Sequence, residues 1–294
     1  MAETKLPTYG GQAVIEGVMM RGAQSVAIAM RAPDQQIVVH TEALSGIYRS
    51  RITKIPFLRG LVVLWDALGL GMRALTISAN TQTGEDEKLE GPVLYLTLGI
   101  SLLIGIGLFF LAPAAVGQLT ERSLHLNAWW GNLAEGLVRL VLLIDYIWAV
   151  GHIPDIRRVF AYHGAEHKTI NAFEAGSELT PEAVKKFSLE HPRCGTAFLL
   201  TLVLFSVLLF SLLGPMPIFW RLASRVLLLP VLAGIAYEYI RWTSNHLNSP
   251  LVKMMVKPGL LLQRLTTREP DLPMLEVAIA AFNAMRLQER QAVP

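Results

Sequence analysis

The chain has 294 residues, enough for one large or two small domains, and 52% of them are hydrophobic while 17% are charged. This composition and a mean hydropathy of +0.42 are unusual for a soluble protein and point to the membrane. The net charge of +3 requires no nucleic-acid partner, because lysine and arginine also collect on the cytoplasmic faces of membrane proteins. A single cysteine, Cys194, excludes an internal disulfide, and the N-terminus lacks the apolar core of a cleavable signal peptide.

Residues 1–56 are expected to form a small β-rich element. The segments Ser25–Arg31 and Ile37–Ala43 predict two strands, joined as a hairpin by the Ala-Pro-Asp-Gln-Gln between them. The segment Gly10–Gly22 interrupts short apolar runs with repeated glycines. This pattern predicts a loop or a close approach between backbones.

A helix is predicted to open at Pro56 and to cover residues 57–80. Its charged residues Arg59, Asp66 and Arg73 recur every seven positions and fall on one stripe, while the remaining positions are mostly apolar. The pattern indicates an amphipathic helix at the membrane interface rather than a full span.

Four membrane spans are predicted within residues 93–240. They are Val93–Leu119, Leu133–Ile153, Thr196–Leu213 and Leu222–Ile240, apolar segments of about the length that a bilayer core roughly 30 Å thick requires. Lysine and arginine concentrate in residues 1–59, in the loop 154–194 and in the tail 241–294. The positive-inside rule therefore places these regions, and both termini, in the cytoplasm. The tail is expected to contain an amphipathic helix from Met274 to about Leu287.

Ionisable residues inside the predicted spans need a partner or a function. They are Glu135, Arg139, Asp145, Arg225 and Glu238. One interpretation is that they pair across helices, for example Arg139 with Glu238, and hold the bundle together. The other is a small transporter or channel, although four spans without inverted-repeat character make a poor transporter.

The loop 154–194 contains the pattern His163-x-x-Glu166-His167, which matches the inverted signature of zinc peptidases. On a helix the two histidines lie one turn apart and share a face, so they could bind one metal ion, while Glu166 could act as a base or a further ligand. The alternative is an exposed helix at the membrane surface whose histidines and glutamate merely contact water or lipid headgroups.

His191 and Cys194 precede the third predicted span and could complete a metal site with His163 and His167. Zinc is the expected metal, with iron as the alternative. Four ligands would make a closed structural site, whereas three would leave a position for a water molecule that Glu166 activates. Cys194 could instead be a nucleophile or an inert core residue. Glu174 and, more weakly, Glu238 are further candidate ligands.

Several polar residues near glycines, prolines and apolar positions are candidates for contacts to a substrate or a lid. They are Glu16, Arg21, Lys168, Arg193, Arg268 and Glu269. The alternative is that they cap helices and form ion pairs within the cytoplasmic part. P-loop, dinucleotide-binding, Cys-x-x-Cys and serine-hydrolase motifs do not occur in the sequence, so those chemistries have no support.

Three blocks of the sequence together resemble the YqhQ-like family of bacterial proteins. The blocks are GGQAVIEGVMMRG at 10–22, YHGAEHKTI at 162–170 with HPRCGT at 191–196, and PGLLLQRLTTREP at 258–270 followed by Glu276-Val277-Ala278. The family carries a domain of unknown function, is regarded as membrane-embedded and is labelled a predicted metal-dependent enzyme. The resemblance implies a metal site at the same His, Glu and Cys positions and implies no substrate.

The expected architecture is an α-helical integral membrane protein of the bacterial inner membrane. It would have about four transmembrane helices, an amphipathic interfacial helix and a small β-containing cytoplasmic cap built from residues 1–56, 154–194 and 241–294. The leading hypothesis for its function is a metal-dependent hydrolase that acts on a peptide or amide bond. The alternatives are a non-catalytic membrane scaffold or assembly factor, with a structural metal or none, and a small transporter or channel. Its partners would be the lipid bilayer and an unidentified substrate or protein.

Overall fold

A four-stranded antiparallel sheet forms the centre of the cap. The computed structural model describes residues 9–44, 55–83 and 92–292. The strands are β1 (Gly10–Val14), β2 (Gly17–Arg21), β3 (Ser25–Arg31) and β4 (Ile37–Ala43), paired in the order β1-β2-β3-β4. The two strands predicted from the sequence are confirmed with the same bounds. The glycine-rich segment 10–22, predicted as a loop or a close approach, is a β-hairpin that turns at Glu16, where φ is 52°.

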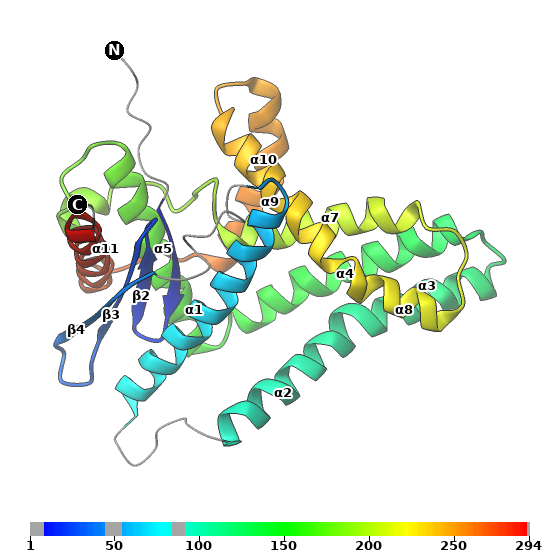
Figure 1. Ribbon diagram of the computed structural model, residues 1–294, viewed down its shortest axis with the longest axis horizontal. Coiled ribbons are helices and arrows are strands. Elements are labelled where there is room, and N and C mark those ends of the chain that lie inside the picture. The colour runs from blue at the N-terminus through cyan, green and yellow to red at the C-terminus, as the bar shows by residue number, and fades with distance from the viewer. Residues whose placement is uncertain (1–8, 45–54, 84–91, 293–294) are drawn as a thin grey trace.

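Both faces of the sheet are covered by helices. Alternate side chains, including Val18 and Met20, pack on one face with α5 (Pro154–Glu174) and α11 (Leu272–Ala292). The intervening side chains, including Met19, pack on the other face with α1 (Leu58–Gln82). Figure 1 shows the sheet with α5 and α11 at one end of an elongated molecule.

Helix α1 connects this cap to the remaining helices. Its C-terminal half covers the sheet, and its N-terminal half packs on α9 (Leu229–Asn245), where Gly60 lies against Tyr237. An ion pair between Arg59 and Glu238 joins the same two helices. The predicted helix 57–80 is therefore present, and it serves as a bridge between the two parts of the fold.

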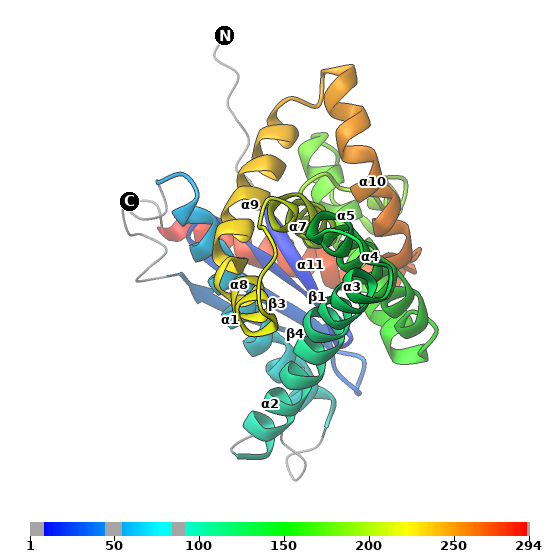
Figure 2. The ribbon, with the colours of Figure 1, turned by 90° about the vertical axis from the view of Figure 1, so that its right-hand side faces the viewer.

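The other helices form an extended bundle, in which Figure 2 shows α4 and α7 nearly end-on. They are α2 (Pro92–Ile106), a π-helical segment η4 (Gly107–Leu111), α3 (Ala112–Ser123), α4 (Ala128–Val150), α7 (Gly195–Ser211), α8 (Ile218–Leu227) and α9. Two further helices, α6 (Pro181–Val184) and α10 (Pro250–Thr266), belong to the segments before and after α7 to α9.

Length and composition support fewer membrane spans than the four predicted. Among the described residues, Leu96–Ser123 is one helix long and apolar enough to cross a bilayer, and α8 with α9 would make a second if the pair, bent by 42°, counted as one span. Helix α7 has 17 residues. Helix α4 carries three charged residues, and α9 begins with Pro230 in its first turn. The structure is thus mostly helical, with a small sheet and one candidate apolar span.

The charged residues of the bundle form a buried network around Glu135. Its carboxylate lies 2.8 Å from Arg139, 2.8 Å from Arg225 and 3.2 Å from Arg221. Arg139 also donates to the carbonyl of Phe109, which the π-helical turn of η4 presents to it. The example pairing of Arg139 with Glu238 is therefore wrong, because Arg139 is satisfied within the bundle and Glu238 by Arg59.

Candidate metal centre

The histidine-rich motif lies on helix α5, which begins with Pro154 at its first turn and has Asp155 beside it. Proline has a backbone angle suited to a helix start, and an acidic side chain there favours the positive end of the helix dipole. His163 and His167 lie one turn apart, as the spacing predicts, and their ring centroids are 4.4 Å apart. The helix therefore presents two imidazoles side by side.

Cys194 brings a third donor to the two histidines. It caps the N-terminus of α7, and its Sγ lies 3.3 Å from Nε2 of His163. One donor atom from each of His163, His167 and Cys194 can be chosen so that all three lie within 4.8 Å of one another. Ligand atoms around a tetrahedral zinc ion are about 3.5 Å apart, given bond lengths of about 2.0–2.3 Å. The largest of the three separations therefore needs to close by about 1.3 Å at most for the side chains to bind one ion.

Backbone carbonyls fix the orientation of both imidazoles. Nδ1 of His163 lies 2.9 Å from the carbonyl oxygen of Thr266, and Nδ1 of His167 lies 2.5 Å from that of Leu189. A protonated Nδ1 donates to each carbonyl and leaves the Nε2 lone pair available, the arrangement that is usual for histidines that bind a metal. Nε2 of His167 is buried and lacks a hydrogen-bond partner among the described residues. A buried polar atom of this kind requires an explanation, and a metal ion would be one.

Glu166 lies on the side of α5 that faces the sheet and is 5% exposed. Burial raises the pKa of its carboxyl group to about 7, against the opposing effects of the neighbouring His163 and of the backbone N–H of Gly11, which donates to it. A side chain at Gly11 would lie 2.9 Å from the Glu166 carboxyl carbon, so glycine allows strand β1 to approach the carboxylate. At neutral pH the group is divided between its acid and base forms.

His191 lies beside the three donors but has other partners. Its ring centroid is 5.7 Å from that of His167, and its Nε2 lies 3.7 Å from Glu174, which also pairs with Arg193. The side-chain amide of Gln263 accepts from the His191 N–H and donates to the His191 carbonyl, at 3.0 and 2.9 Å. Burial lowers the pKa of the His191 imidazole. His191, Glu174 and Arg193 therefore form a neighbouring polar group.

Close backbone packing holds these parts together at Gly164, between the two histidines. A methyl group at this position would collide with the carbonyl oxygen of Arg268 and would lie 2.8 Å from Cδ2 of Leu189. The N–H of Arg268 donates to the carbonyl of Phe160 at 2.9 Å. The guanidinium of Arg268 donates to nearby carbonyls of its own segment, so Arg268 contributes to the site through its backbone.

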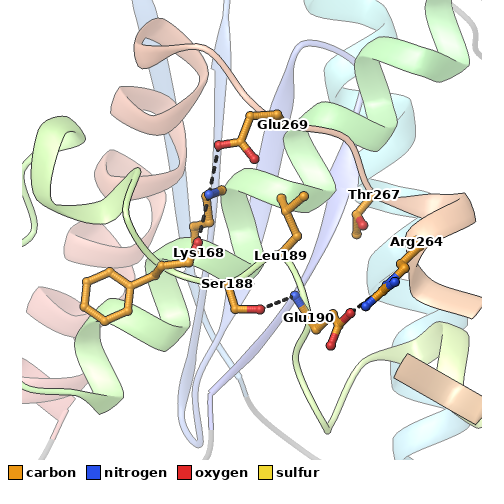
Figure 3. A pocket seen from close by; sticks show the side chains of 8 residues that line it. Lys168, Ser188, Leu189, Glu190, Arg264, Thr267 and Glu269 are labelled. Atoms are coloured by element: carbon orange, nitrogen blue, oxygen red, sulfur yellow. Dashed lines mark hydrogen bonds and ion pairs between the residues drawn. The ribbon is translucent and has the colours of Figure 1, made fainter. Parts of the chain in front are cut away.

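Lys168 and Glu269 form an ion pair of 2.9 Å at the edge of a cavity of about 400 Å³ (Figure 3). The cavity lies beside Leu189 and Thr267, and Leu189 is the residue whose carbonyl orients His167. Two of the residues expected to contact a substrate or a lid are thus brought to one hollow near the three donors.

Glu16 and Arg21 lie in the first β-hairpin. Glu16 pairs with Arg158 at 2.5 Å and accepts from the Tyr162 hydroxyl at 3.3 Å, which attaches the hairpin to α5. The Arg158 hydrogen bond lowers the pKa of Glu16. Arg21 ends strand β2, opposite Gly10 of β1.

Sequence reasoning missed the groups that orient the imidazoles. The carbonyls of Leu189 and Thr266 contact the imidazoles of His167 and His163 across long stretches of chain, and the side chain of Gln263 bonds to the backbone of His191. A backbone carbonyl has no residue-type signal. The nearest indication in the sequence is that Thr266 lies within the block 258–270 and that Leu189 lies two residues before the block 191–196.

A family model for a protein of unknown function, DUF1385, matches residues 55–288 of this chain. The chain belongs to this family. The uncharacterized protein YqhQ of Bacillus subtilis (strain 168) is 37% identical over 295 residues, which cover 95% of this chain and 92% of that protein. No solved structure matches the chain.

The family model and the relative confirm that the chain belongs to the YqhQ-like family, and their descriptions name neither a membrane nor a metal. The matched region contains His163, His167 and Cys194, whereas strands β1 to β4 precede it. Because the descriptions of the family and of the relative name no activity, arguments about function depend on the geometry of the site.

Proposed function

We propose that His163, His167 and Cys194 bind a divalent metal ion and that the protein is a metal-dependent hydrolase. The observation that carries the proposal is the buried Nε2 of His167, unpaired among the described residues and close to the Cys194 thiol. Two imidazoles and one thiol are a donor set suited to zinc, with iron as the alternative. Carbonyls already hold both Nδ1 atoms, as such a site requires.

The geometry favours a site with an open position over a closed structural one. His191, which would complete a closed site, is turned toward Glu174. Three protein ligands with a vacant fourth position are the arrangement of catalytic zinc sites. This supports an enzyme over a scaffold with a structural metal.

Glu166 is suited to act as the general base. When bound, the metal ion supplies a polarising charge that makes a water molecule more acidic. The Glu166 carboxylate would remove the proton as the water oxygen bonds to the carbonyl carbon of an amide. The same carboxyl group would then return the proton to the leaving nitrogen as the carbon–nitrogen bond breaks. Burial, which raises the pKa of this carboxyl group, favours the protonated form that returns the proton to the leaving nitrogen.

We also propose that the helical bundle crosses the bacterial inner membrane several times, with both termini in the cytoplasm. Support comes from the distribution of side chains in α4 and α8. Leu137, Val141 and Leu227 are more than half exposed, whereas Glu135 and Arg225 are 1% exposed. Apolar exteriors and paired interior charges are expected of helices that contact lipid.

Exposed tryptophans support the same placement. Trp129, Trp130 and Trp220 lie near the starts of α4 and α8, whereas Trp148 and Trp242 lie near the ends of α4 and α9. Tryptophan is enriched at both surfaces of a bilayer. The candidate metal centre would lie at the cytoplasmic surface, because Cys194 begins the apolar helix α7 and α5 follows α4.

The proposal is tested by purifying the full chain in detergent without chelators and measuring its metal content. We expect about one equivalent of zinc or iron, lost in His163→Ala, His167→Ala and Cys194→Ser. Cobalt-substituted protein should show a thiolate-to-cobalt absorption band that Cys194→Ser removes. Glu166→Gln should keep the metal and abolish hydrolysis in a panel of peptides and N-acyl amides.

Exposed His246 is the matched control, and His246→Ala should leave metal content unchanged. Folded wild-type protein that contains no metal, and takes up none on addition of zinc, would overturn the metal centre. A metal-containing protein whose cobalt spectrum shows a fourth protein ligand from His191 would instead favour the scaffold.

A further inference from the structure

The cavity beside the candidate metal centre is bordered by two ion pairs. Its lining includes Lys168, Leu189, Glu190, Arg264, Thr267 and Glu269. Lys168 pairs with Glu269, and Arg264 pairs with Glu190, each at 2.9 Å. Figure 3 shows the two pairs with Leu189 between them. The four charges sum to zero, so the cavity is polar without being selective for one sign of charge.

The partners within these pairs differ in how firmly they are held. The Lys168 side chain is 5% exposed, and its ammonium group also donates to the carbonyls of Lys185 and Phe187 at 2.8 Å each. The Glu269 side chain is 55% exposed. A ligand carboxylate that displaced Glu269 would therefore leave the buried Lys168 ammonium group paired, whereas loss of every carboxylate would leave a buried charge without a partner.

We propose that this cavity binds a small zwitterion with one carboxylate and one ammonium group, an amino acid or a short peptide, and that this ligand regulates the metal centre. The ligand's carboxylate takes the place of Glu269 at Lys168. Its ammonium group pairs with the carboxylates of Glu190 and the displaced Glu269. A volume of about 400 Å³ is within the usual range of small-molecule pockets.

The regulatory part rests on the metal centre proposed above. The cavity walls include Leu189, whose carbonyl holds His167, and Thr267, which follows the carbonyl of Thr266 that holds His163. A ligand that shifts either wall moves the acceptor that orients an imidazole. Coupling between two sites is reciprocal, so the ligand changes the affinity for zinc by the factor by which zinc changes the affinity for the ligand.

Calorimetric titration of the zinc-free full chain with L-alanyl-L-alanine tests the ligand class separately from the metal. We expect saturable binding that Glu190→Gln weakens about tenfold, the effect of losing about 1.4 kcal/mol. N-acetyl-alanine, which keeps only the carboxylate, should bind more tightly to Glu269→Gln than to the wild type, because the competing carboxylate is gone. Glu276→Gln is the control, since Glu276 pairs with Arg31 away from the cavity.

Equal binding of alanyl-alanine and of N-acetyl-alanine amide would overturn the zwitterion assignment. Binding of glycerophosphoethanolamine, which has a phosphodiester in place of the carboxylate, without binding of alanyl-alanine would overturn the assignment of an amino acid or peptide. Unchanged affinity of Glu269→Gln for N-acetyl-alanine would do the same. Zinc affinity, measured by chelator competition, should change severalfold at saturating dipeptide, and a change below about twofold would overturn the regulatory part. If the dipeptide binds but zinc does not, the proposed enzyme fails and the zwitterion site stands.

Discussion

Replacing Gly164 by alanine should weaken metal binding more than it weakens the fold. The added methyl group would meet the carbonyl oxygen of Arg268, a backbone atom that cannot rotate away, and Cδ2 of Leu189 at 2.8 Å. The segments on both sides of this contact carry the carbonyls of Leu189 and Thr266 that orient the imidazoles. The substitution therefore acts on the metal centre through its supports and leaves every donor atom in place.

The size of the effect follows from two opposing contributions. Overpacking typically costs about 1–3 kcal/mol, whereas alanine in a helix is about 1 kcal/mol more favourable than glycine. The free energy of unfolding should therefore fall by about 0–2 kcal/mol, which lowers the melting temperature by a few degrees at most. Disturbing the groups that orient metal ligands typically costs about 10- to 100-fold in metal affinity.

The assay combines two measurements on detergent-purified protein. Thermal unfolding of the zinc-free form gives the change in stability, and competition with a chromophoric chelator gives the zinc affinity. Gly69→Ala is the control, because no described atom lies within 4 Å of the position that its methyl group would take in α1. This control should be slightly stabilised and should bind zinc normally. Zinc affinity of Gly164→Ala within about twofold of the wild type would refute the reasoning.

Three further substitutions test other parts of the structure. Arg225→Leu removes a main partner of buried Glu135 and should lower the free energy of unfolding by about 3–5 kcal/mol. The melting temperature of the protein in detergent should fall strongly, and a small fall would contradict a buried network. Glu16→Gln should lower the free energy of unfolding by up to about 1 kcal/mol at pH 7 and by little at pH 3. Pairing with Arg158 lowers the pKa of Glu16, so the stabilisation from this pair disappears as the pH falls through the pKa of Glu16 in the folded protein. A difference in unfolding free energy that is the same at both pH values would exclude the Glu16–Arg158 ion pair as its cause. Asn127→Ala removes the side-chain cap of α4 and should cost about 1 kcal/mol in the same melting assay; an unchanged melting temperature would contradict a contribution from the cap.

Local sequence patterns are sufficient to predict those elements whose main contacts are between residues close in the sequence. The strands Ser25–Arg31 and Ile37–Ala43 follow from strand-forming residues on both sides of a polar turn, and the structure has these bounds. The one-turn spacing of His163 and His167 holds because both lie within one helix. In each case the relevant contacts are between residues close in sequence.

Membrane spans are harder to predict, because the sequence does not show whether a charged side chain faces the outside of the bundle or pairs with another charge inside it. Arg221 lay just outside the predicted span that began at Leu222, yet it pairs with Glu135 inside the bundle. Helix α8 ends at Leu227 and α9 begins at Leu229, so the predicted span Leu222–Ile240 contains a bend. Both features depend on contacts between helices that are distant in the chain.

The supports of the candidate metal centre also connect it to the bundle. Cys194 caps α7, and the carbonyl of Thr266 comes from the end of α10. Helix α10 packs on α7 at Gly259, where an added Cβ would lie 3.1 Å from Cβ of Ala197. A shift of α7 along its axis would move one donor atom and, through α10, the acceptor that orients His163. Metal affinity in this protein should therefore respond to the packing of its apolar helices, and a bilayer that alters that packing would alter the metal centre without contacting it.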